Sequence, residues 1–153
     1  NTTEQEPVQN ETINKTVSYY QGQLKDNPLG KDEQFNLAGY SYGSVLQAQV
    51  ALKLANSGQV IDNLILIGSP ISDKSDLMKQ LKDNKNIKNV IRYAIKGDAL
   101  SNPQDVYDFL KGVKQGITDG DKAHHFDAAR PGKEAAQLIH TIITWLRQQG
   151  VKN

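Results

Sequence analysis

The pentapeptide GYSYG at residues 39–43 constrains the fold more than any other feature of this chain. Residues 35–38 before it form a short apolar run, which is typical of a buried strand. Residues 44–55 after it are mostly good helix formers and contain neither Gly nor Pro. A G-x-S-x-G pattern between a strand and a helix predicts a sharp turn with Ser41 at its apex.

Such a turn has a chemical use, because a serine hydroxyl is a poor nucleophile until it is held beside a base. We expect a strained backbone at Ser41, and we expect Gly39 and Gly43 to leave room that side chains would fill. The helix would direct its N–H groups, that of Tyr42 first, toward an oxyanion formed during acyl transfer. The alternative interpretation is a glycine-rich turn without chemistry, as occurs in many α/β proteins.

Composition limits the classes of protein to which the chain can belong. Its 153 residues, 37% hydrophobic and 23% charged, fit one folded domain. A formal net charge of +1 gives no electrostatic case for nucleic acid or an anionic membrane. The absence of cysteine excludes disulfides, thiolate metal sites and a cysteine nucleophile but leaves the compartment open. No apolar run is long enough to predict a transmembrane segment, and the composition suits a bacterial protein.

Hydrophobic periodicity divides the rest of the chain into alternating helices and strands. Residues 1–11 are polar and predict a loose arm before a single domain over residues 12–153. Further elements are expected as a helix at 12–25, strands at 64–67 and 90–95, and a final helix at 133–149. This alternation predicts an α/β fold whose parallel sheet is covered by helices on both faces.

The placement of polar residues converges on one edge of that sheet. Ligand sites in open parallel sheets lie beyond the carboxyl ends of the strands. Ser41 follows the first strand, Asp98 follows the third, and His124 and His125 precede the final helix. We therefore expect the candidate nucleophile, carboxylate and bases to share this edge.

The base is expected to be a histidine, because imidazole can accept the serine proton and return it to the leaving group. His124 and His125 are the candidates, since His140 lies within the final helix and is interpreted as a surface or packing residue. Two alternatives stay open for the pair: a metal site, and loop histidines without a role.

The carboxylate that orients the base is expected to be Asp98. A solvated turn aspartate or a helix cap is the alternative for this residue. Asp73 and Asp76 follow the second strand and are weaker candidates, and Asp127 lies too close in sequence to the histidines. Ser69 is interpreted as a cap for the following segment rather than as a second nucleophile.

With GYSYG between strand and helix, a later carboxylate and a histidine before the last helix, the chain resembles an α/β-hydrolase. The resemblance implies an esterase or lipase with Ser41 as nucleophile, Asp98 as orienting acid and His125 as base. His125 is preferred to His124, the alternative base, because an aromatic residue often follows the histidine in this superfamily. The implied chemistry needs no cofactor or metal, and its substrate is a small-molecule or lipid ester.

The resemblance covers the C-terminal half of that fold. The superfamily has several strands before its nucleophile and takes one oxyanion donor from an early loop, whereas this chain has a polar arm and one helix there. No strand is evident between Asp98 and His125. Two further hypotheses follow: a silent hydrolase-like binding module, and a piece of a larger hydrolase. An open sheet edge would favour association with a missing N-terminal half or a second copy.

Overall fold

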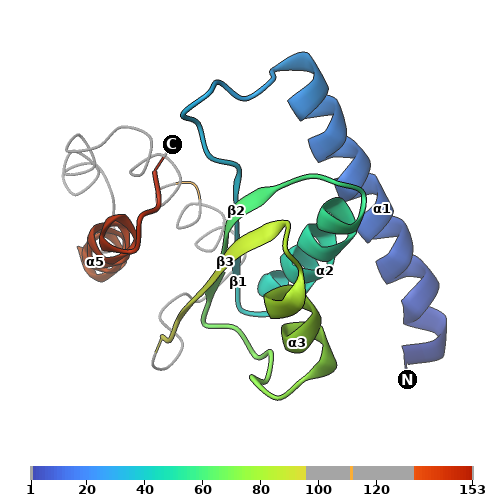
Figure 1. Cartoon of the computed structure of the whole chain (residues 1–153). Helices are drawn as coiled ribbons and strands as arrows, with labels where there is room; N and C mark the ends of the chain where they lie inside the picture. The colour runs from blue at the N-terminus through green and yellow to red at the C-terminus, as the bar shows by residue number, and fades with distance from the viewer. Residues whose placement is uncertain (1, 96–110, 112–132, 153) are drawn as a thin grey trace.

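The computed structural model describes residues 2–95, 111 and 133–152, and these residues form an α/β fold around a parallel sheet (Figure 1). The sheet has three strands in the order β1-β2-β3, with β2 in the centre. Its strands are β1 (Asn36–Tyr40), β2 (Ile61–Ile67) and β3 (Ile87–Tyr93). The described helices are α1 (Thr2–Asp26), α2 (Tyr42–Asn56), α3 (Asp76–Asp83) and α5 (Lys133–Gln148).

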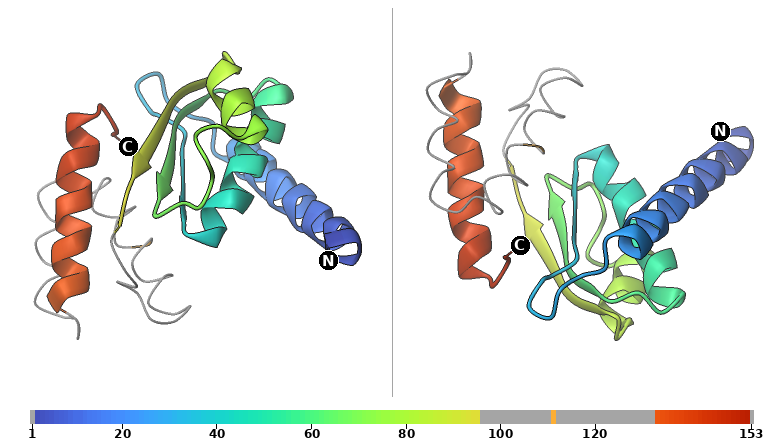
Figure 2. Two further views of the ribbon diagram at one scale, coloured as in Figure 1. Left: turned by 90° about the horizontal axis from the view of Figure 1, so that it is seen from below. Right: turned by 90° about the horizontal axis from the view of Figure 1, so that it is seen from above.

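Helices cover both faces of the sheet, as the alternation of elements predicts (Figures 1 and 2). Helices α2 and α3 pack on one face with α1 outside α2, and α5 packs on the other. Strand β2 supplies Leu64 and Leu66 to the first core and Ile65 and Ile67 to the second, each at most 1% exposed. Strand β2 is therefore buried on both faces, which explains its continuous apolar run, as expected for a central parallel strand.

The prediction of a loose N-terminal arm was wrong for residues 2–11, because these residues belong to α1, which begins at Thr2. The acidic and amide residues of this stretch are acceptable helix formers, and acidic residues suit a helix N-terminus. Farther along, Glu11 and Lys15 form an ion pair of 3.1 Å one turn apart, and Ile13 is buried against α2. None of the described helices is both long and apolar enough to cross a bilayer.

Strands β2 and β3 each begin three residues before their predicted apolar runs, and each carries an asparagine in this early part. Asn36, Asn63 and Asn89 are direct cross-strand partners on the α5 face of the sheet. Asn63 is 1% exposed, and its Nδ2 donates to Asn36 Oδ1 at 2.8 Å. Asn89 Nδ2 donates to Asn63 Oδ1 at 3.2 Å. Asparagine is disfavoured in strands, so local propensity did not indicate the early starts of β2 and β3, which the hydrogen bonds between these amides stabilise.

The side chains of Asn36 and Gln34 also hold the segment that follows α5. Asn36 Nδ2 donates to Lys152 O at 2.7 Å, and the Lys152 N–H donates to Gln34 Oε1 at 2.9 Å. Gln34 Nε2 in turn donates to Gly150 O at 3.1 Å. The C-terminal end of the described chain is thus held against the start of β1, at the end of the sheet opposite Ser41.

Asn63→Ala is expected to lower the free energy of unfolding by about 2 kcal/mol, because it removes a buried amide that bonds the half-buried Gln34 and Asn36 side chains and opens a small cavity. Asn89→Ala is the matched control: the Asn89 side chain is exposed, so water can replace its amide and the loss should stay below about 1 kcal/mol. Urea unfolding followed by circular dichroism measures both free energies. Equal losses in the two variants would contradict the difference in burial between Asn63 and Asn89.

Candidate functional site

Ser41 stands at a sharp turn between β1 and α2, in a backbone conformation that non-glycine residues avoid. Its φ is 54° and its ψ is −126°. Among the described residues it is the one non-glycine residue with positive φ. Such a conformation costs about 1–3 kcal/mol and persists only where the surrounding structure determines it. The predicted strand, strained serine and helix are therefore all confirmed.

The turn is sharp because Ser41 belongs to the sheet on one side and to the helix on the other. Its N–H donates to Ile67 O at 2.9 Å and so continues the ladder between β1 and β2. Its carbonyl accepts from the Ser44 N–H at 3.1 Å and so begins the first turn of α2. One residue makes the whole change of direction, and its side chain lies at the carboxyl edge of the sheet.

The two glycines of the pentapeptide differ, which corrects half of the prediction made for them. An ideal Cβ on Gly39 would lie 2.6 Å from Ser44 Cα and 2.9 Å from Gly43 O, closer than real atoms approach. An ideal Cβ on Gly43 would meet nothing within 4 Å. Gly39 is therefore required by the close passage of β1 under α2, whereas Gly43 sits in the first turn of α2 with open space beside it.

The hydroxyl of Ser41 is not used to cap α2. Ser41 occupies the N-cap position of this helix, yet its side chain makes no capping hydrogen bond. Within the described part of the chain, no other hydrogen bond is made by this half-buried hydroxyl. A serine at an N-cap ordinarily bonds a first-turn N–H group. The Ser41 hydroxyl is therefore available to react, and the first N–H groups of α2 receive no hydrogen bond from the side chain of their N-cap residue.

Ser41→Gly is expected to be more stable than Ser41→Ala by about 1 kcal/mol. Glycine removes the strain at this φ, which stabilises the fold by about 1–3 kcal/mol. It also makes the unfolded chain more flexible, which costs about 0.5–1 kcal/mol of stability. Ser41→Ala keeps Cβ and removes a hydroxyl without a described partner, so it should match the wild type. Urea midpoints of the three proteins test this. A glycine variant no more stable than the alanine variant would contradict backbone strain.

A hydrogen-bonded pair of hydroxyls, the buried one of Ser44 and the half-buried one of Ser69, lies beneath the turn, and the sequence prediction missed it. The hydroxyl of Ser44, which is 0% exposed, donates to the Ser41 carbonyl, and a second hydrogen bond of 2.7 Å joins Ser44 Oγ to Ser69 Oγ. Ser69 Oγ also accepts from the Ile71 N–H at 3.3 Å and so stabilises the turn after β2, whereas the N-cap of the following helix α3 is Ser75. Ser44 and Ser69 lie 25 residues apart, so only their polar character in a first helical turn and a strand end hinted at the contact.

Arg92 of β3 holds the loop that carries Ser69. Its guanidinium donates to Ile71 O at 2.5 Å and to Ser69 O at 3.5 Å, and it pairs with Asp73 at 2.9 Å. Asp73, a weaker candidate for the orienting acid, is thus engaged by Arg92. Asp76, the other, lies in the first turn of α3.

The ends of the three strands lie side by side, as the site prediction requires. The Gly68 N–H donates to Tyr93 O at 2.8 Å, and Ser41 is bonded to Ile67. Asp98, His124 and His125 themselves, and Asp127, lie outside the described residues, so their positions relative to Ser41 stay predictions. His140 is exposed on α5, as expected.

Aromatic side chains surround this edge. The Tyr42 side chain, directly after Ser41, is 82% exposed. The Tyr40 ring is half-buried, and its Cε2 lies 3.5 Å from an ideal Cβ on Gly68. Tyr93 meets Trp145 of α5 edge-to-face, with ring centroids 5.3 Å apart. The edge therefore combines aromatic surface with the Ser41 hydroxyl, which makes no capping hydrogen bond to α2.

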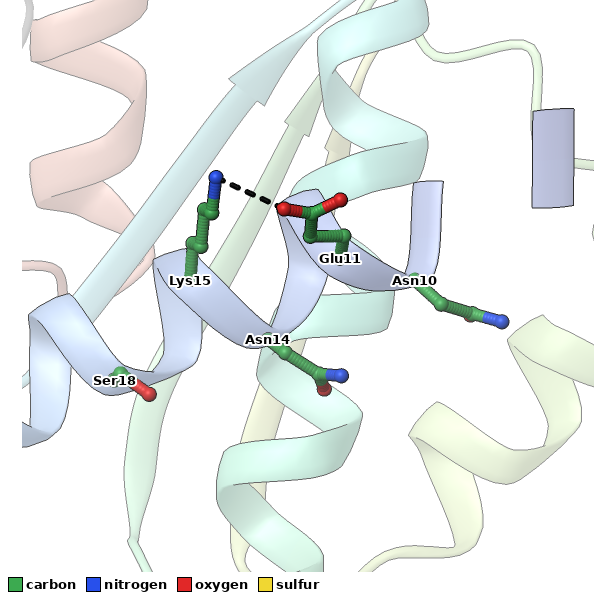
Figure 3. A pocket seen from close by; sticks show the side chains of 5 residues that line it. All are labelled: Asn10, Glu11, Asn14, Lys15 and Ser18. Carbon is green, nitrogen blue, oxygen red and sulfur yellow. Dashed lines mark ion pairs between the residues drawn. The ribbon is translucent and has the colours of Figure 1, made fainter. Parts of the chain in front are cut away.

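A pocket of about 520 Å³ lies elsewhere, on the surface of α1 (Figure 3). Asn10, Glu11, Asn14, Lys15 and Ser18 line it, and Glu11 and Lys15 pair with each other there. It is open and lined by one helix that carries no predicted site residue. It therefore gives no support to a second site.

Comparison of the chain with protein-family models, with curated proteins and with solved structures finds no match.

Proposed function

We propose that this chain is a serine hydrolase of the α/β-hydrolase type, which cleaves a carboxylic or lipid ester through an acyl-enzyme on Ser41. The conformation of Ser41 is the observation that carries the proposal: strained, at a strand-to-helix turn, with a hydroxyl that caps nothing. Strain of this kind clusters at functional sites, where it is part of the mechanism. A silent binding module would have no need of it.

In the proposed reaction, Ser41 Oγ attacks the ester carbonyl carbon while His125, or His124 as the alternative, accepts its proton. Asp98 orients the imidazole and stabilises its charged form. The Tyr42 N–H and the positive end of α2 stabilise the oxyanion. The histidine returns the proton to the leaving alcohol, and the acyl-enzyme is then hydrolysed by a water molecule that the same base activates.

The proposal also includes a contribution from outside this chain. A second oxyanion donor would come from a preceding half of the fold, on a longer protein or another chain that pairs with an edge of the sheet. One such donor is worth about 3 kcal/mol, or a hundred- to a thousandfold in turnover. The chain alone would then hydrolyse esters slowly while depending fully on Ser41.

The substrate is proposed to carry an apolar acyl or alkyl group. The exposed Tyr42 ring and the half-buried Tyr40 ring flank Ser41 and offer apolar surface beside the reacting bond. Burial of such surface contributes about 25 cal/mol per Å². Longer acyl chains should therefore be preferred to acetate.

A series of p-nitrophenyl esters from acetate to decanoate tests the reaction class. The wild type is expected to hydrolyse at least one ester above the buffer rate, and Ser41→Ala is expected to lose that excess entirely. Because the proposed histidine base must be neutral to accept the serine proton, the rate should rise with pH as that histidine loses its proton. An excess rate that Ser41→Ala retains would contradict the proposed nucleophile.

A further inference from the structure

Ser44 is the buried hydroxyl that the proposed mechanism does not use. It lies three residues after Ser41 in α2, is 0% exposed, and donates from Oγ to the Ser41 carbonyl. We propose that Ser44 is a positioning residue, which holds the Ser41 peptide in its strained conformation and so keeps the hydroxyl in place. The catalytic consequence of this inference rests on the proposed function, while its structural part does not.

Two donors of one residue act on the same carbonyl. The Ser44 N–H donates to Ser41 O at 3.1 Å, and the Ser44 hydroxyl adds a second bond to that oxygen. The direction of the Ser41 carbonyl sets ψ of Ser41, which is −126°. A strained conformation persists only where its surroundings over-determine it. The hydroxyl supplies the additional constraint that the helix N–H alone does not.

The hydroxyl of Ser44 is itself held from the other side. Ser69 Oγ lies 2.7 Å from Ser44 Oγ, and the loop that carries Ser69 is fixed to β3 by Arg92 through Ile71 O at 2.5 Å. The support for the turn therefore extends from β3, across the loop after β2, to the first turn of α2. Because Ser44 is inaccessible, water does not replace its hydroxyl in Ser44→Ala.

The expected consequence is a slower chemical step with unchanged binding. A small displacement of a reacting group costs up to about a hundredfold in rate. With a fluorophosphonate, Ser44→Ala should lower the limiting rate of Ser41 modification by about ten- to a hundredfold. The probe concentration at half the limiting rate and the apparent pKa of the rate should stay unchanged. Ser69→Ala keeps the bond between Ser44 and Ser41 and should lower the limiting rate less.

The labelling experiment compares wild type, Ser44→Ala and Ser69→Ala, with each rate referred to the fraction of chains that finally becomes labelled. A purely structural role would reduce that fraction and leave the rate of the remainder unchanged. Equal limiting rates in wild type and Ser44→Ala would overturn the inference. An unlabelled wild type would instead count against the proposed function, so the two failures are distinguishable.

A second measurement needs no activity. Ser44→Ala should lower the urea midpoint more in the Ser41 background than in the Ser41→Gly background, because glycine adopts this conformation without the additional constraint. The same midpoint shift in both backgrounds would overturn the positioning role, whatever the labelling shows. Both backgrounds keep the β1–α2 contact at Gly39, so the comparison isolates the hydroxyl.

Discussion

Gly39→Ala is expected to lower the free energy of unfolding by about 3 kcal/mol, and Gly43→Ala to raise it by about 0.5 kcal/mol. The methyl group at residue 39 would lie 2.6 Å from the Ser44 backbone, so β1 and α2 must separate. The methyl group at residue 43 meets open space in the first turn of a helix, where alanine is the better helix former. The two substitutions are chemically identical and lie four residues apart.

The measurement is urea unfolding followed by circular dichroism and by the fluorescence of Trp145, which packs against Tyr93 on the opposite face of the sheet. Coincident transitions would establish that the whole fold responds as one unit. Since α2 must move, Gly39→Ala should also remove the reactivity of Ser41, whereas Gly43→Ala should retain it. Equal stabilities for the two variants would contradict the close passage of β1 under α2.

The turn was predictable because its determinants are local. Ser41 and Gly39 lie within one pentapeptide, and the strand and helix that it joins have clear apolar and helix-forming sequences. The error at Gly43 came from treating the two glycines alike. The strand side of the turn is crowded by the helix backbone, whereas a residue in the first helical turn directs its Cβ outward.

Other features depend on contacts between distant residues, which local patterns do not encode. Asn63 is polar in a strand, and its hydrogen bonds with Gln34, Asn36 and Asn89 explain why a buried amide is tolerated there. The hydrogen bond between Ser44, in the first turn of α2, and Ser69, after β2, likewise joins residues that are distant in sequence. The helical course of α1 from Thr2 was missed because polar sequences with modest helix propensity resemble disordered arms.

The residues of the proposed triad also differ in how far the sequence could predict them. Ser41 could be predicted with its conformation, because the elbow pattern includes both. Asp98 and His125 were predicted from the order of residues along the chain and from the rule that strand ends share an edge. The structure brings the ends of β1, β2 and β3 together, and the two residues themselves lie outside its described part.

The most direct test of an activated serine is labelling of the folded chain with a fluorophosphonate, read by intact mass and peptide mapping. The probe forms a covalent bond to an activated serine oxygen and does not depend on the natural substrate. Ser41→Ala removes the proposed nucleophile, and Ser18→Ala, an exposed serine on α1, is the matched control. We predict one adduct per chain, located on Ser41, in the wild type and in Ser18→Ala, and none in Ser41→Ala. An adduct that persists in Ser41→Ala, or no adduct on the folded wild type, would contradict the account.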